Sequence, residues 1–219
     1  RGITANANMT KIAATVGGSD GGYIYTSSDA GNNWESLVSA GKRNWRYITS
    51  SDDFSKLAAT VTGVDIYVSL DGGVTWSAKG VQKSWRGITA SNDFMNMFAS
   101  TYDGYLFKST DGGDTWSKIT SSAINQGNST YWMGVTSSPD FGKWVAVVEK
   151  VDSTSDGAIY ISENQGSTWN EMNVPNDVRW MGITTSPDFV KMVATSYNGK
   201  IWQSDDTGAN WKSDGIIQH

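Results

Sequence analysis

The chain has 219 residues, a formal net charge of −5 and no cysteine. The absence of cysteine excludes disulfides and thiolate metal sites, and an acidic chain without a basic run is a poor partner for nucleic acid or anionic membranes. No apolar stretch approaches the roughly 20 residues that a membrane-spanning helix needs. The chain opens at Arg1 rather than at a methionine, which indicates a processed or trimmed end.

Four kinds of short segment follow one another along the chain and then repeat. The first has the pattern Trp-x-Gly-Ile-Thr, as at 85–89, and begins incompletely at residues 1–4. The second resembles Lys-x-Ala-Ala-Thr, as at 56–60, and the third is an aromatic stretch such as Tyr23-Ile24-Tyr25. The fourth begins at the Trp of an eight-residue motif, Ser-x-Asp-x-Gly-x-Thr-Trp. Such β-branched and aromatic segments, separated by Gly, Asp, Asn and Ser, predict short strands A, B, C and D joined by turns.

The eight-residue motif occurs five times, and its final Trp residues lie 42, 40, 53 and 42 residues apart. A four-stranded unit of this length matches one blade of a β-propeller. We therefore predict an all-β, five-bladed β-propeller of four-stranded antiparallel blades, each with the motif in the turn between strands C and D. The single domain spans 1–219, with blades at about 1–40, 41–80, 81–123, 124–175 and 176–219. The Asp, Gly and Trp positions of the motif are Asp29, Gly31, Trp34, Asp71, Gly73, Trp76, Asp111, Gly113, Trp116, Asn164, Gly166, Trp169, Asp206, Gly208 and Trp211.

The two ends of the chain continue the same pattern. The segment after Trp211 aligns with the segment after Trp76, and one further Trp before Arg1 would complete the next repeat. This predicts a closed monomeric ring with adjacent termini.

The repeated motif resembles the Asp-box, or BNR, repeat of sialidases, sortilin-type receptors, xyloglucanases and photosystem assembly propellers. In that family the box lies on the rim away from the usual active face, and the resemblance slightly favours a secreted or cell-surface protein. Locally, the Asp carboxylate can accept hydrogen bonds from turn amides, and Gly can adopt a positive φ. Each box offers one carboxylate at most, so we predict neither a metal site nor a cofactor.

Candidate ligand-binding residues lie on the opposite face, where the B–C turns and the D–A connections vary most and two insertions fall, at 120–131 and 149–157. Trp and Arg at the start of strand A could stack sugars and hold a carboxylate, or they could pack between blades. The pairs Tyr-Asp and Tyr-Asn in two B–C turns suit sugar recognition but also suit ordinary hairpins. The candidates are Trp45, Arg46, Trp85, Arg86, Trp132, Trp180, Tyr102, Asp103, Tyr197 and Asn198.

We predict a non-catalytic binding platform for a glycan or protein ligand, and a lectin-like use of shallow repeated sites is one form that it could take. One alternative is a glycoside hydrolase, which needs two facing carboxyl groups about 5 to 9 Å apart. Only Glu149, of four glutamates, borders the varied face. Sialidases bind the substrate carboxylate with three Arg, which Arg1, Arg46 and Arg86 could mimic, but also need a Tyr nucleophile and an acidic helper. The other alternative is an assembly factor that binds a protein partner.

Overall fold

The computed structural model of the chain describes residues 1–124, 130–149, 157–175, 178–197 and 199–214. Within these ranges the regular elements are strands, with one short 3-10 helix, η1 (Val38–Ala40). No helix among the described residues is long and apolar enough to cross a membrane. The all-β prediction is confirmed.

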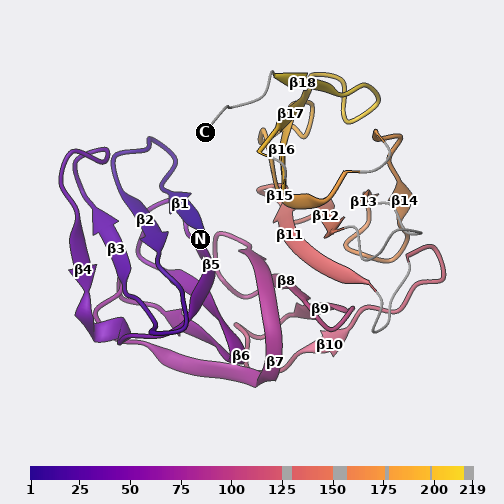
Figure 1. Cartoon of the computed structure of the whole chain (residues 1–219). Helices are drawn as coiled ribbons and strands as arrows, with labels where there is room; N and C mark the ends of the chain where they lie inside the picture. Colours follow the sequence, from indigo (N-terminus) through magenta and orange to yellow (C-terminus); the bar gives the residue numbers. More distant parts are fainter. Residues whose placement is uncertain (125–129, 150–156, 176–177, 198, 215–219) are drawn as a thin grey trace. The chain divides into compact units, whose positions relative to one another are not determined.

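The described strands form four antiparallel sheets, in which neighbouring strands follow chain order (Figure 1). The first sheet contains β1 (Ile3–Ala5), β2 (Ile12–Thr15), β3 (Ile24–Ser27) and β4 (Glu35–Leu37). The second contains β5 (Trp45–Ser50), β6 (Leu57–Ser69), β7 (Ser77–Ala90), β8 (Met97–Thr101), β9 (Leu106–Ser109) and β10 (Ser117–Lys118). The third contains β11 (Tyr131–Ser137), β12 (Trp144–Glu149), β13 (Ala158–Ser162) and β14 (Asn170–Glu171), and the fourth contains β15 (Trp180–Thr185), β16 (Met192–Ser196), β17 (Ile201–Ser204) and β18 (Lys212–Asp214).

The prediction of five blades is wrong, because repeats 2 and 3 share the six-stranded second sheet. Strand β7 is both strand D of repeat 2 and strand A of repeat 3. Its middle section stays paired with β6, where Ser84 lies opposite Thr62 and Lys83 opposite Val64. Between repeats 1 and 2, by contrast, η1 interrupts the extended chain before β5 begins. The D–A connection therefore decides whether two repeats form two sheets or one.

The chain divides into two compact units, each with its own apolar core. The first unit comprises Arg1–Ala99 and Lys108–Ser117, and the second comprises Ser100–Phe107 and Lys118–His219. In the first unit, Ala13 and Ile24 of the first sheet pack against Trp45 and Leu57 of the second. The prediction of one domain and the prediction of adjacent termini both stay predictions, and residues 215–219 lie outside the described residues.

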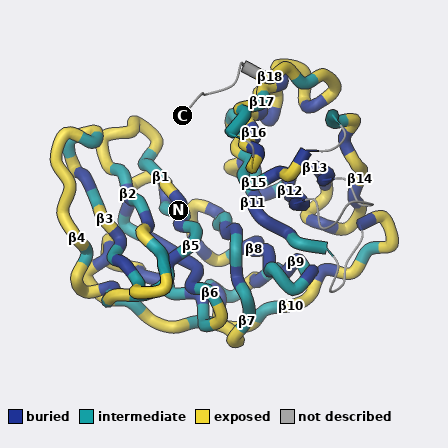
Figure 2. The backbone as a smooth tube through the Cα atoms, viewed as in Figure 1, coloured by how far each residue is buried: buried dark blue, intermediate teal, exposed yellow. Residues whose placement is uncertain are grey.

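The core of the second unit lies between its third and fourth sheets. Val147 and Ile159 of the third sheet pack with Trp180 and Met192 of the fourth. All six residues of β12 are buried, whereas both residues of the edge strand β14 are exposed. Figure 2 shows this division along the backbone, with buried residues on the inner strands and exposed residues in the turns. Burial on both faces explains why β12 carries a single polar side chain, that of Glu149.

Candidate functional site

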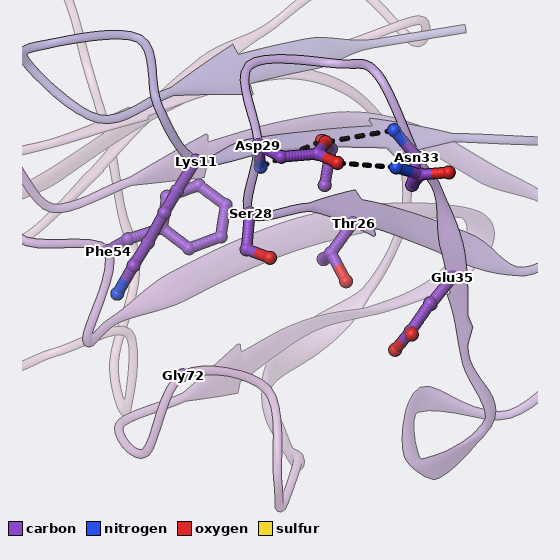
Figure 3. Close-up of a pocket in the computed structure, with 9 residues that line it drawn as sticks. Lys11, Thr26, Ser28, Asp29, Asn33, Glu35, Phe54 and Gly72 are labelled. Carbon is purple, nitrogen blue, oxygen red and sulfur yellow. Dashed lines mark hydrogen bonds between the residues drawn. The ribbon is translucent and has the colours of Figure 1, made fainter.

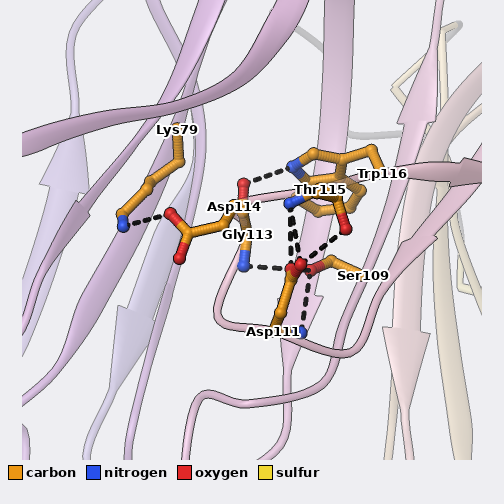
Figure 4. Close-up of polar contacts among 7 residues, drawn as sticks. All are labelled: Lys79, Ser109, Asp111, Gly113, Asp114, Thr115 and Trp116. Atoms are coloured by element: carbon orange, nitrogen blue, oxygen red, sulfur yellow. Dashed lines mark hydrogen bonds and ion pairs between the residues drawn. The ribbon is translucent and has the colours of Figure 1, made fainter.

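Each Asp box is a self-contained network of hydrogen bonds, shown for the third repeat in Figure 4. The Asp111 carboxylate accepts hydrogen bonds from the Ser109 hydroxyl at 2.8 Å and from the Thr115 amide at 2.9 Å. The Ser109 oxygen in turn accepts the Gly113 amide at 2.9 Å, and the Trp116 indole donates to the Gly113 carbonyl at 2.9 Å. Every partner belongs to the same turn, so the box fixes its own hairpin.

These hydrogen bonds stabilise the charged carboxylate and lower its pKa. The side chain of Thr75, followed by its amide and the Ser69 hydroxyl, lowers the pKa of Asp71 to about 2. The pKa is also about 2 for Asp29, Asp111 and Asp206. In the fourth box, Asn164 keeps the geometry without a charge, since its Oδ1 accepts the Thr168 amide at 2.8 Å and its Nδ2 donates to the Thr168 hydroxyl at 2.8 Å. An uncharged residue at this position argues for a structural role.

A second turn, between strands A and B, lies against each Asp box. In repeat 2 the Asp53 carboxylate accepts hydrogen bonds from the Ser51 hydroxyl at 2.7 Å and the Ser55 amide at 2.9 Å, while Phe54 adopts a left-handed φ of 65°. The Gly72 amide of the Asp box donates to the Ser55 carbonyl at 2.7 Å. In the other four repeats an equivalent hydrogen bond joins an Asp-box amide to an A–B carbonyl: Ala30 to Thr10, Gly112 to Met95, Gln165 to Gly142 and Thr207 to Val190. In each of the five repeats, the A–B turn and the Asp box therefore lie side by side.

A polar pocket of about 290 Å³ opens on this face between repeats 1 and 2 (Figure 3). Lys11, Glu35 and the hydroxyl groups of Thr26 and Ser28 line it, together with Asp29. The Asp29 carboxylate is already bonded to the side chain of Asn33 and to the Ser27 hydroxyl. The pocket therefore offers a ligand the Lys11 ammonium group and the Glu35 carboxylate, whereas the Asp29 carboxylate stabilises the turn.

On the opposite side of the repeats, three arginines of successive repeats lie close together in the first unit. We call Arg1, Arg46 and Arg86 the arginine row. Burial, with the positive charges of Arg86 and Arg1 beside it, lowers the pKa of Arg46 to about 10. The Arg46 guanidinium also donates to the hydroxyl of Thr62 in the B–C hairpin of its repeat. The role of these arginines in ligand binding stays a prediction.

Two buried hydroxyl groups set the spacing of the arginine row. The Thr15 hydroxyl donates to the Arg46 carbonyl at 2.6 Å, and the Thr60 hydroxyl donates to the Arg86 carbonyl at 2.7 Å. The Thr60 oxygen also accepts the Tyr47 amide at 3.0 Å. The last residue of strand B in one repeat therefore fixes strand A of the next.

Sequence reasoning missed Tyr47, which lies among the arginines. Strand β5 has a β-bulge between Trp45 and Ile48, and Arg46 and Tyr47 are the two residues within it. Bulges often redirect side chains beside functional sites. Burial raises the pKa of the Tyr47 phenol, although Arg86, Arg46 and Arg1 act in the opposite direction. One signal was available, since the other four repeats have Gly at this position.

The four predicted tryptophans of strand A are buried side chains rather than surface groups. Trp45, Trp85, Trp132 and Trp180 each have 0% exposure. Each packs in an aromatic cluster: Trp45 contacts Tyr67 with a ring-centroid distance of 5.5 Å, and Trp85 contacts Trp116 at 5.1 Å. Their burial favours packing over sugar stacking, and their role in ligand binding stays a prediction.

The predicted hairpin residues lie in the second unit, although Tyr102 and Asp103 belong to repeat 3, as Arg86 does. The Tyr102 ring stacks on Tyr131 with a centroid distance of 4.2 Å and an interplanar angle of 8°, and one oxygen of Asp103 is buried without a hydrogen-bond partner among the described residues. Tyr197 is 65% exposed and stacks under the Arg179 guanidinium at 4.1 Å. Asn198 lies outside the described residues, as do most of the two insertions.

Glu149 is the carboxylate that the hydrolase alternative requires on this side. It is buried and forms an ion pair with Arg179. Arg86 and Arg1 act on Arg46, and all three arginines act on the Tyr47 phenol.

Comparison with known proteins supports the fold. The BNR/Asp-box repeat family matches residues 67–78. A GH74 enzyme of Niastella koreensis is 15% identical with a TM-score of 0.74, over 97% of this chain and 37% of the enzyme. YCF48 bound to a D1 peptide is 17% identical with a TM-score of 0.60, over 97% of this chain and 65% of YCF48. A chain of a nidogen–laminin complex is 12% identical with a TM-score of 0.76, over 100% of this chain and 80% of the other.

At such low identities these likenesses show the fold alone. The chain spans less than two thirds of the length of the GH74 enzymes and of the peptide-bound YCF48. No curated protein sequence matches it. The antiparallel sheets and the structural likenesses together show a β-propeller fold, in which residues 67–78 match the BNR/Asp-box repeat.

Proposed function

We propose that this protein is a non-catalytic binding module whose arginine row holds a carboxylate of a protein partner. The observation that carries the proposal is the grouping of Arg1, Arg46 and Arg86 beside the B–C hairpin of repeat 2. The Arg46 guanidinium is partly buried, and a buried positive charge is costly unless an anion pairs with it. A bound carboxylate would supply that pairing.

The chemistry of arginine favours a carboxylate ligand. The guanidinium group is planar and presents its N–H donors in a fork that matches the two carboxylate oxygens. The Thr15 and Thr60 hydroxyls hold the backbone of Arg46 and Arg86, so the row is partly ordered before a ligand arrives. Preorganised donors lose less entropy on binding.

A protein partner is favoured over a glycan by two considerations. The tryptophans that would have stacked sugars are buried. Two of the similar structures are complexes with peptide or protein, namely YCF48 with a D1 peptide and nidogen with laminin. An assembly or scaffold role therefore suits the site better than a lectin-like role.

Catalysis has less support, although GH74 enzymes share the fold. Retaining and inverting glycosidases use two carboxyl groups across the scissile bond. Glu149 is buried and forms an ion pair with Arg179, so it does not face a second carboxyl group across a bound sugar. The raised pKa of the Tyr47 phenol also opposes its use as a nucleophile.

An array experiment tests the proposal. Each peptide is displayed once with a free carboxyl terminus and once as the amide, beside a glycan array. The control variant is Arg46→Met with Arg86→Met, since repeats 4 and 5 have Met133 and Met181 at this position. We expect signals from free carboxylates that the variant loses while its circular dichroism spectrum is unchanged. Signals confined to glycans, or no signal at high protein concentration, would contradict the proposal.

A further inference from the structure

The pocket between repeats 1 and 2 opens on one face of the first sheet (Figure 3). In the paired strands, Ala13 lies opposite Thr26, and Thr26 lies opposite Glu35. The side chains of paired residues share a face of the sheet, as do those of residues two positions apart in one strand. Ala13 joins the apolar core of the first unit, and the same face presents four polar side chains to the pocket: Lys11, Thr26, Ser28 and Glu35.

Repeat 1 differs from the other repeats at the positions that line this pocket. Where repeat 1 has hydroxyl groups at Thr26 and Ser28, repeat 2 has the apolar residues Val68 and Leu70. At the position of Glu35, the other four repeats have Ser, Ser, Asn and Lys. The Asp box of repeat 2 forms the same hydrogen bonds without this polar set, so the fold does not require it.

The ammonium group of Lys11 differs in its surroundings from the equivalent lysines of two other repeats. Lys56 of repeat 2 donates to a backbone carbonyl of repeat 3 at 2.8 Å, and Lys143 of repeat 4 forms an ion pair with Glu163 at 3.2 Å. Within the described part of the chain, no hydrogen bond or ion pair engages the Lys11 ammonium group or the Glu35 carboxylate. Both charges therefore remain available to a ligand.

The two charges belong to different strands and stand apart on the sheet. Lys11 directly precedes β2 and Glu35 begins β4, with β3 between them. Two strand spacings and a stagger of two residues separate their backbones by about 12 Å. Figure 3 shows the Ser28 and Thr26 side chains between them. A ligand that engages both charged side chains must therefore carry its own charges at opposite ends.

We propose that this pocket binds a small zwitterion, whose carboxylate lies on Lys11 and whose ammonium group lies on Glu35. A ligand with a single charge would leave one of the two protein charges unpaired. A dipeptide carries both charges at its ends, and the hydroxyl groups of Thr26 and Ser28 can bind its peptide group. The volume of about 290 Å³ lies at the lower end of the range for small-molecule sites, which suits a ligand of this size. The site is separate from the arginine row and does not depend on it.

Three molecules that differ only in charge test the proposal. Glycylglycine carries both charges, N-acetylglycine lacks only the ammonium group, and glycine N-methylamide lacks only the carboxylate. Binding to the full chain is followed at constant ionic strength through the backbone amide of Gly72 for the pocket and the Nε–H of Arg46 for the arginine row. An exposed ion pair changes affinity by up to about fivefold, so we expect glycylglycine to bind the pocket about that much more tightly than either other molecule. The net charge of −5 favours the cation over the zwitterion, so long-range attraction would not produce this order.

Variants of the two charged residues assign each contact. Lys11→Met should weaken binding of glycylglycine by up to about fivefold but leave glycine N-methylamide unchanged, because that molecule has no carboxylate. Glu35→Gln should weaken glycylglycine and leave N-acetylglycine unchanged at Gly72. The matched control is Lys191→Met, at the equivalent position of repeat 5, which should alter none of these affinities. Equal weakening of all three molecules by Lys11→Met would place its effect in packing and overturn the proposal.

The outcomes for the two sites are distinguishable. If glycylglycine and N-acetylglycine shift the Arg46 resonance but leave the Gly72 amide unchanged, the zwitterion site is wrong and the arginine row stands. If glycylglycine shifts Gly72 in the expected order but neither molecule shifts Arg46, the zwitterion site stands and the arginine row is wrong. Equal affinities of the three molecules at Gly72 would also overturn the zwitterion site.

Discussion

Thr60→Val tests whether one buried hydroxyl group organises the binding site. Thr60 has 0% exposure, and its hydroxyl group joins the Tyr47 amide to the Arg86 carbonyl. Valine has nearly the same shape, so the substitution removes hydrogen bonds without opening a cavity. It leaves the Tyr47 N–H buried without its partner, which costs about 1–3 kcal/mol. The added methyl group offsets at most about 0.8 kcal/mol of this.

The net loss in the free energy of unfolding should therefore be about 1–2 kcal/mol, measured by urea denaturation with an unchanged m-value. Arg86 is no longer fixed relative to Tyr47, so binding of N-acetylglycine should weaken as well. Thr60→Ser is the control, because it keeps the hydroxyl group and loses only a methyl group. It should lose some stability but retain the affinity for N-acetylglycine.

Two results would refute this reasoning. One is a Thr60→Val protein with the stability and affinity of the unmodified chain. The other is an equal loss of affinity in Thr60→Ser, which would place the effect in packing rather than in the hydroxyl group. Repeat 4 already has Val147 at the equivalent position, so valine is compatible with the strand itself.

Three further predictions concern the turns and the strand contacts. Ser109→Ala leaves the Gly113 amide without its acceptor. The free energy of unfolding, measured by urea denaturation, should fall by about 1–3 kcal/mol, and an unchanged value would show that water replaces the hydroxyl group. The pKa of Asp71 is about 2 in the folded protein, below its ordinary value of 3.8, so its contribution to stability is complete above about pH 4 and is lost as the pH falls through about 2. Asp71→Asn should flatten the decline of the melting temperature over that interval, and an unchanged slope would refute this. Gly2→Ala should lower the free energy of unfolding by about 1–3 kcal/mol and weaken carboxylate binding. Gly18→Ala should do neither, because its Cβ would meet no atom within 4 Å. Equal effects of the two substitutions would argue against close strand contact.

Much of the fold was predictable because its determinants are local. The Asp box contains all the partners of its carboxylate within eight residues, so the motif alone indicates the turn, as for Ser109 and Asp111. The alternation of four segments likewise marks the strands. The number of sheets depends instead on pairing across the D–A connection, where Ser84 lies opposite Thr62, and no local pattern reports that pairing.

The candidate site was predictable only in part. Arg46 and Arg86 were identified from their recurrence beside Trp, and the structure places them together. The tryptophans of strand A recur because each repeat needs a large buried side chain at this position, and for that reason they are not exposed to a ligand. Tyr47 breaks the repeat and was overlooked, which suggests that a functional residue in such a protein is better sought where one repeat differs from the others.

The most direct test of the account is the position of a carboxylate in a crystal soaked with 4-bromobenzoate, whose bromine is located by anomalous scattering. The account predicts a bromine peak beside the arginine row, with the carboxylate oxygens on the Arg46 guanidinium group. Peaks confined to the Asp-box face, for example at Lys11, together with an arginine row that holds no anion, would contradict it.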